Sequence, residues 1–112
     1  MKVLAIPKVI KYLDSLVPIL FEKGYFIFED TAQKYVDELA DDIFDNLPKK
    51  RHRPAPCYYD KYGKGMYFAT FPKNKHTTWY AFFTKYNDNG ETVYLIRYIG
   101  NNHTEAHHLH TG

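Results

Sequence analysis

Cysteine is almost missing from this chain, and long apolar runs are missing altogether. The single cysteine, Cys57, has no partner for an internal disulfide, which favours a reducing compartment and predicts a cytoplasmic protein. No run approaches about 18 consecutive apolar residues, so no membrane-spanning helix and no membrane partner are expected. The apolar stretch at the N-terminus is interrupted by Lys8, Lys11, Asp14 and two prolines, which is not typical of a signal peptide.

Recognisable catalytic and cofactor motifs are also missing. The chain has no Walker motif, no CxxC pair and no Ser-His-Asp or Cys-His arrangement with a local signature. Four histidines (His103, His107, His108 and His110) crowd the C-terminal end, but zinc prefers rigidly held ligands with second-shell support. We therefore expect no cofactor and no physiological metal site.

Aromatic residues and basic residues are abundant, and both bear on the fold. Within 112 residues the chain carries 11 tyrosines and 8 phenylalanines, which predicts one domain, 1–112, with a core built largely from rings. Residues 1–48 have five lysines against nine acids, whereas residues 49–112 have ten Lys or Arg against four acids. This asymmetry indicates either a face for a polyanion or acidic protein, or two solvated faces that happen to differ.

Two amphipathic helices are predicted in the first half, over about 8–23 and 30–47. Apolar residues recur at helical spacing in both, with Pro18 expected to kink or split the first helix and Gly24 to end it. Asp30 and Gln33 form a capping-box pattern at the start of the second helix. The acidic residues on the other side of that helix are expected to form a solvated face.

Strands are predicted over about 2–6, 65–71, 77–86 and 92–100, with 48–64 as a proline-rich loop. The sequence "NDNG" predicts a hairpin turn between the last two strands. Pairing Tyr86 with Glu91 puts Tyr80, Phe82, Arg97 and Ile99 on one face, and an unpaired buried guanidinium would be unfavourable. We therefore expect the face with Arg97 to be open. The predicted class is α+β, with two N-terminal helices on a mostly antiparallel sheet of about four strands.

The element order and three stretches of sequence are distinctive. One strand, two helices and three antiparallel strands follow one another, and the stretches read "YLDSLVPILFEKGYFIFEDTAQKYVDELADDI", "KNKHTTWYAFF" and "YLIRYIGNNHTEA". In these features the chain resembles the RelE/ParE toxin superfamily, in a branch of RelE-like toxins from bacterial type II toxin–antitoxin pairs. The resemblance covers about residues 2–109.

The resemblance implies a toxin whose partners are a cognate antitoxin protein and mRNA on the ribosome. Its activity would be that of a metal-independent endoribonuclease (an mRNA interferase), in which the RNA 2′-OH attacks the scissile phosphate with help from His, Lys and Arg side chains. Carried over by position, the candidate catalytic residues are His103, Arg97, Lys75 and His107. Candidate RNA-binding residues are Lys73, His76, Tyr80, Asn102, Arg51 and Arg53.

Two short segments depart from the pattern of active relatives. Thr77 and Thr78 stand where relatives commonly carry a Tyr-Arg pair, and Asn101 and Asn102 follow Gly100 where many carry an arginine. Two alternatives therefore stay open. One is a non-catalytic ParE-like inhibitor of a protein target such as DNA gyrase, and the other is a degenerate toxin that only binds its antitoxin.

Overall fold

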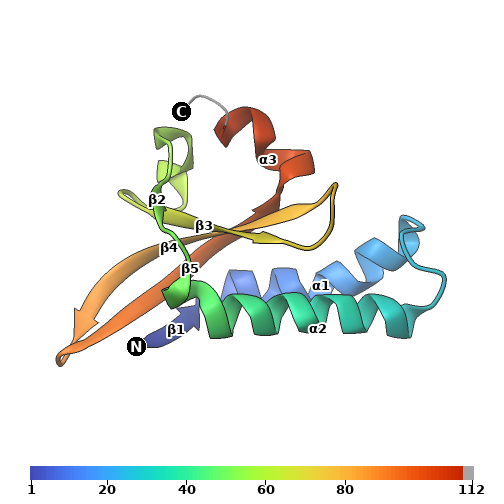
Figure 1. Ribbon diagram of the computed structural model, residues 1–112, viewed down its shortest axis with the longest axis horizontal. Helices are drawn as coiled ribbons and strands as arrows, with labels where there is room; N and C mark the ends of the chain where they lie inside the picture. The colour runs from blue at the N-terminus through green and yellow to red at the C-terminus, as the bar shows by residue number, and fades with distance from the viewer. Residues whose placement is uncertain (110–112) are drawn as a thin grey trace.

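The computed structural model describes residues 1–109, which form three helices and one five-stranded mixed sheet (Figure 1). The sheet order is β1-β5-β4-β3-β2, with β1 parallel to β5 and the other pairs antiparallel. The strands are β1 (Lys2–Ala5), β2 (Arg53–Pro54), β3 (Tyr67–Pro72), β4 (Thr78–Asp88) and β5 (Glu91–Asn101). The helices are α1 (Pro7–Glu22), α2 (Glu29–Asn46) and α3 (Asn102–Leu109), with 3₁₀ turns η1 (Leu47–Lys49) and η2 (Cys57–Lys61).

The α+β class is confirmed, but the predicted count of two helices and about four strands is wrong. The short strand β2 lies within the predicted proline-rich loop, and α3 occupies the histidine-rich end of the chain. Both elements escape prediction from local pattern because β2 has two residues and α3 has no clear apolar stripe. None of the helices in the described part of the chain is both long and apolar enough to cross a bilayer.

The β4–β5 hairpin turns at Asn89 and Gly90, as the "NDNG" sequence predicts. Both residues have positive φ, 52° and 87°, which is typical of a type I′ turn. The predicted pairing of Tyr86 with Glu91 is wrong, because Asp88 pairs with Glu91 and Tyr86 pairs with Val93. The two-residue shift keeps the same side chains on each face near the turn.

A β-bulge at Arg97 changes the faces farther along the hairpin. Phe83 pairs with Ile96 and Phe82 with Tyr98, so Arg97 is the extra residue of β5. Beyond the bulge Tyr98 therefore joins Phe82, and Ile99 joins the opposite face. The predicted placement of Ile99 beside Tyr80 and Phe82 is wrong for this reason.

Helices α1 and α2 cover one face of the sheet (Figure 1). The largest buried side chains of this layer include Trp79, Phe71 and Phe83, against Leu39 and Ile43 of α2. Trp79 Nε1 donates a hydrogen bond to the Tyr35 hydroxyl at 2.9 Å, so the indole keeps a polar partner inside the core.

The ends of the two long helices differ in part from the sequence expectations. Gly24 has φ of 80° and follows the last turn of α1, as predicted, with Tyr25 N–H donating to the Leu20 carbonyl. Pro18 does not divide α1, because it lies on the exposed side, where water can solvate the carbonyl that loses its donor. The predicted capping box is also wrong, since α2 begins at Glu29 and the Gln33 amide donates to Asp37 instead.

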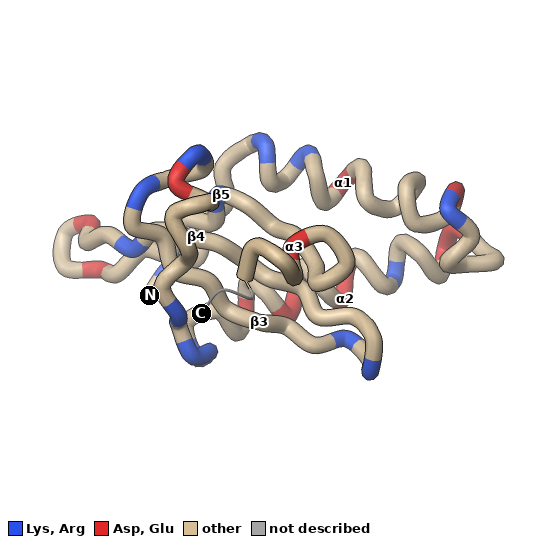
Figure 2. The backbone as a smooth tube through the Cα atoms, turned by 90° about the horizontal axis from the view of Figure 1, so that it is seen from above, with Lys and Arg blue, Asp and Glu red and all other residues tan. Residues whose placement is uncertain are grey.

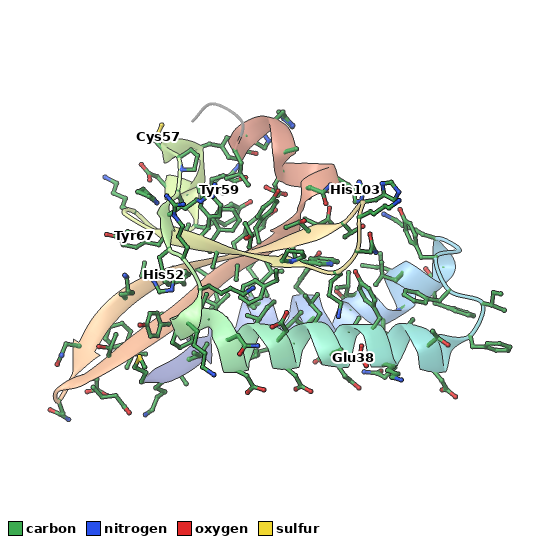
Figure 3. All side chains as sticks on the ribbon, viewed as in Figure 1. Glu38, His52, Cys57, Tyr59, Tyr67 and His103 are labelled. Carbon is green, nitrogen blue, oxygen red and sulfur yellow. The ribbon has the colours of Figure 1, made fainter. Side chains whose placement is uncertain are left out.

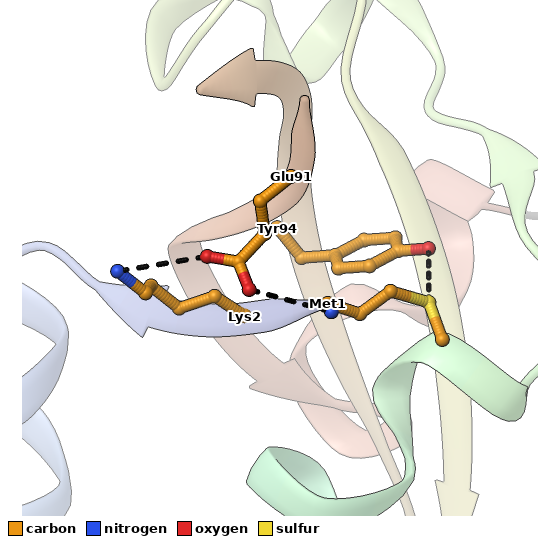
Figure 4. A network of polar contacts seen from close by, with 4 residues as sticks. All are labelled: Met1, Lys2, Glu91 and Tyr94. Atoms are coloured by element: carbon orange, nitrogen blue, oxygen red, sulfur yellow. Dashed lines mark hydrogen bonds and ion pairs between the residues drawn. The ribbon is translucent and has the colours of Figure 1, made fainter. Parts of the chain in front are cut away.

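The first strand is fixed to β5 at the edge of the sheet (Figure 4). The amino group of Met1 and Nζ of Lys2 lie 3.6 and 3.8 Å from the Glu91 carboxylate, and the Tyr94 hydroxyl contacts the Met1 sulfur. These exposed ion pairs contribute little to stability individually. The backbone pairing of β1 with β5, from Lys2 opposite Val93 to Ala5 opposite Ile96, holds the strand in register.

The other face of the sheet is covered by η2 and α3, which contradicts the open face predicted for it. Tyr59, Met66, Phe68 and Phe82 form a second buried cluster there. The ring of Tyr59 stacks on that of Phe82 with centroids 4.2 Å apart. The proline-rich segment is therefore a cover for the sheet, and both faces of the central strands are buried.

Removing the Phe83 side chain tests the helical layer. Phe83→Ala leaves a cavity at a fully buried position, and we expect the free energy of unfolding to fall by about 3–5 kcal/mol. Urea denaturation followed by circular dichroism measures this change. The control is Tyr86→Ala on the same strand, where the ring is 46% exposed, and a loss as large as that of Phe83→Ala would contradict the assignment of faces.

Candidate functional site

The turn between β3 and β4 meets the start of α3 and forms the candidate site, which we call the turn–helix site (residues 73–78 and 102–103). Asn74 Oδ1 accepts hydrogen bonds from the backbone N–H groups of His76 and Thr77, which shapes the turn. Asn102 then joins the two elements, because its Oδ1 accepts from Thr78 N–H and its Nδ2 donates to the His76 carbonyl, at 2.9 and 3.0 Å. One amide side chain thus places the first turn of α3 against the basic turn.

His103 stands at this junction with its ring on the surface. Its backbone N–H donates to Asn101 Oδ1, and its Nε2 lies 3.2 Å from the Thr77 hydroxyl. The ring is therefore oriented through one nitrogen, while Nδ1 has no partner among the described residues. An exposed imidazole with one nitrogen held and the other available has the geometry of a general base or acid.

The turn supplies positive charge beside His103. Lys73 and Lys75 flank Asn74, His76 follows, and the turn contains no acid (Figure 2). Lys73 Nζ lies 5.2 Å from the centroid of the Tyr35 ring, a cation–π distance that anchors this lysine to α2. Lys75 is exposed and free to reach toward a ligand.

Five of the residues predicted from sequence come together in this site: Lys73, Lys75, His76, Asn102 and His103. His107 lies one turn farther along α3, so it shares a helix face with His103. Its ring centroid is 3.7 Å from that of His108.

The other predicted residues lie elsewhere. Arg97 is on β5 at the bulge, where its Nε donates to the Thr84 hydroxyl at 3.1 Å. Tyr80 packs edge-on against Phe68, and Arg53 pairs with Phe68 across β2 and β3. Arg51 and Arg53 flank His52 in sequence, and Figure 3 shows His52 and His103 toward opposite ends of the sheet.

Glu105 is the residue that sequence reasoning missed. Its side chain is 5% exposed, and its carboxylate accepts hydrogen bonds from the hydroxyls of Tyr59, Tyr98 and Thr104 at 2.8–2.9 Å. Burial raises the pKa of both tyrosines well above the ordinary value, and the hydrogen bonds to Glu105 raise it further. Both phenols therefore stay protonated and act as donors, which fixes α3 against η2 and β5.

A glycine makes room for this carboxylate. A Cβ at Gly100 would lie 2.7 Å from Glu105 Cγ, a distance that real side chains do not adopt. The only signal in the sequence was a glycine, Gly100, five residues before an acid, Glu105, in a chain with many tyrosines. Nothing in the local sequence shows that Glu105 contacts Gly100 or the tyrosines.

His108 covers the outer side of the same junction. Its ring stacks on Tyr58 with centroids 3.6 Å apart and planes 10° apart. Burial in this stack lowers the pKa of His108, and the neighbouring His107 lowers it further. His110 lies outside the described residues. Among those residues no three His, Cys, Asp or Glu side chains converge as metal ligands.

Comparison with known proteins identifies no relative. No protein-family model, curated protein or solved structure matches the chain.

Loss of the Glu105 carboxylate tests the anchor of α3. Glu105→Ala leaves the hydroxyls of Tyr59 and Tyr98 without their acceptor, and we expect unfolding free energy to fall by about 2–4 kcal/mol. Urea denaturation gives the value. Glu38→Ala, at an exposed position of α2, should change it by less than about 0.5 kcal/mol. Equal effects of the two substitutions would contradict the proposed role of Glu105.

The His108 stack predicts a pH dependence of α3 docking. Because the folded-state pKa lies below the ordinary 6.5, the docked helix is favoured above that pH and weakened as pH falls through it. A proton NMR titration should place the His108 midpoint below 6.5, and Tyr58→Ala should return it toward 6.5. A midpoint at or above 6.5 in the folded wild type would show that the stack does not form.

Proposed function

We propose that this protein is the toxin of a type II toxin–antitoxin pair and acts as an mRNA endonuclease on the ribosome. The observation that carries the proposal is the placement of His103 beside a turn with two lysines and a histidine. A proton-transfer group next to fixed positive charge is what RNA cleavage by its own 2′-OH requires. The element order of one strand, two helices and then antiparallel strands also supports it.

The site residues have distinct roles in this proposal. His103 takes the proton of the 2′-OH through Nδ1, while Thr77 holds the ring at Nε2. The 2′-oxygen then bonds to phosphorus, and the bond from phosphorus to the 5′-oxygen breaks. Lys75 and Lys73 stabilise the negative charge that develops on the phosphate oxygens.

The leaving 5′-oxygen needs a proton, and in this proposal either His107 or His76 supplies it. His107 is one helical turn from His103 on the same face of α3, about 6 Å along the axis. His76 lies in the turn itself, where its carbonyl accepts from Asn102. The products are a 2′,3′-cyclic phosphate and a 5′-hydroxyl, with no net proton consumed.

The groove between α1 and α2 offers a surface for the proposed antitoxin. It is a cavity of about 220 Å³ on the helical layer, with an apolar floor that includes Leu13, Val17 and Val36. Asp14 and Asp37 line it and make it acidic. Its chemistry fits an amphipathic helix with an apolar stripe and basic flanks.

One observation favours the alternative, a non-catalytic inhibitor of a protein target such as DNA gyrase. The sheet face opposite the long helices is filled by aromatic rings and Glu105 and covered by η2 and α3. The cations of the candidate nuclease site are therefore confined to the edge at the β3–β4 turn. A protein that only binds a target does not need cations arranged around a scissile phosphate, so this small basic edge would be sufficient for it.

Induced expression in a bacterial host tests the proposal, with total mRNA mapped for new 5′ ends. Wild type should arrest growth and cut translated messages, and His103→Ala should reduce cutting by about 100-fold or more, since acid–base groups contribute 10²–10⁴. Lys75→Ala should also reduce cutting, whereas Lys64→Ala, at an exposed position outside the site, should not.

Two results would reject nuclease activity. Growth arrest with intact messages would favour the protein inhibitor. Soluble protein without growth arrest would leave a chain that only binds its antitoxin.

A further inference from the structure

A small cleft between α1 and β5 is lined by two cations, three tyrosines and the apolar residues Val9 and Ile99. It has a volume of about 170 Å³, and its polar lining consists of Lys8, Tyr12, Tyr62, Arg97 and Tyr98. Lys8 comes from the first turn of α1, Tyr62 from the segment after η2, and Arg97 from the bulge of β5. Two cations from separate elements thus face one space whose lining, among the described residues, includes no carboxylate.

The contacts that hold the Arg97 side chain leave the two terminal nitrogens of its guanidinium available to bind a ligand. Its Nε donates to the Thr84 hydroxyl, and no carboxylate of residues 1–109 forms an ion pair with it. Its stem passes under Gly63, where a Cβ would lie 2.8 Å from Arg97 Cδ. A half-buried guanidinium without a carboxylate is poorly compensated, so an anion in the cleft would stabilise it.

The tyrosines give the cleft a rigid wall and neutral donors. The rings of Tyr62 and Tyr98 stack with centroids 4.2 Å apart and planes 10° apart. The Tyr98 hydroxyl is occupied by Glu105, but burial raises the pKa of Tyr12, and Glu105 raises it further, so the Tyr12 hydroxyl stays protonated. Glu105 lies behind Tyr98 and does not line the cleft.

We propose that this cleft binds an oxyanion of the phosphate class, through Lys8 and Arg97. The cavity is smaller than the ~300–1,000 Å³ typical of pockets for drug-sized ligands, so it suits a single phosphate group and not a whole nucleotide. The phosphate belongs either to the free ion or to the end of a larger molecule such as RNA.

The site is separate from the turn–helix site. Arg97 lies four residues before the end of β5 at Asn101, about 13 Å at strand spacing, and His103 lies beyond that end in α3. Phosphate binding in the cleft is therefore independent of RNA cleavage at the turn–helix site, and a result that rejects one of these two proposals does not reject the other.

Isothermal titration with inorganic phosphate tests the site at low ionic strength. Wild type should bind one phosphate per chain, and Lys8→Ala and Arg97→Gln should each weaken binding at least fivefold. Gly63→Ala should weaken it similarly with all charges intact, because it displaces Arg97. Lys34→Ala, at an exposed position on α2, is the matched control for loss of charge and should bind as wild type does.

The source of the phosphate is distinguished by a short oligoribonucleotide with and without a 5′-phosphate. Tighter binding of the phosphorylated form, lost in Lys8→Ala, assigns the site to an RNA end, and equal binding of the two forms assigns it to the free ion.

No phosphate binding by the wild type would overturn the proposal. Equal weakening by Lys34→Ala would also overturn it, since only overall charge would then matter. Lys8→Ala changes an exposed side chain, so its result stands even if Arg97→Gln fails to fold.

Discussion

The buried carboxylate of Glu105 fixes how the second face of the sheet is closed. It is buried among aromatic rings, and this burial is tolerated because three hydroxyl groups donate hydrogen bonds to it. Two of these donors come from different elements, Tyr59 of η2 and Tyr98 of β5. The carboxylate therefore joins the proline-rich cover, the central hairpin and the last helix at one point.

The position of His103 follows from that junction. β5 ends at Asn101 and α3 begins at Asn102 without an intervening loop, so the direction of α3 is set by what holds its first turns. Glu105 holds one side, and Asn102 holds the other by bonding to the β3–β4 turn. His103 lies between these two contacts and consequently faces the basic turn. Of the cations in the second half of the chain, Lys73 and Lys75 lie at this turn, whereas Arg97 lies at the bulge of β5 and lines a separate cleft.

The features that could be predicted from sequence are those encoded by neighbours in the chain. The apolar stripes of α1 and α2 and the turns at Gly24 and Asn89–Gly90 depend on local spacing and on backbone preferences. The resemblance named His103 and the residues of the turn as candidates, and five of these candidates do come together, but the contacts that join them could not be predicted from the sequence. Arg97 was grouped with them from the resemblance and from the face expected to be open, which η2 and α3 cover instead.

What could not be predicted depends on contacts between distant residues. Glu105 is 46 positions from Tyr59, and in its local sequence of threonine, alanine and histidine it is typical of an exposed helical acid. The cover formed by η2 has no periodicity, because its burial comes from single rings such as Tyr59 and not from a repeating face. The open face predicted for the sheet was wrong for the same reason.

Native-state hydrogen exchange tests most directly whether α3 is fixed as described. The amides of α3 beyond its first turn and the Thr78 N–H, which donates to Asn102 Oδ1, are the reporters. If the Glu105 and Asn102 contacts hold the helix, these amides exchange slowly and together, with protection well above that of exposed turns. Exchange of the α3 amides at the rate of an unstructured chain, with the sheet still protected, would contradict the account and remove the basis for placing His103 at the turn.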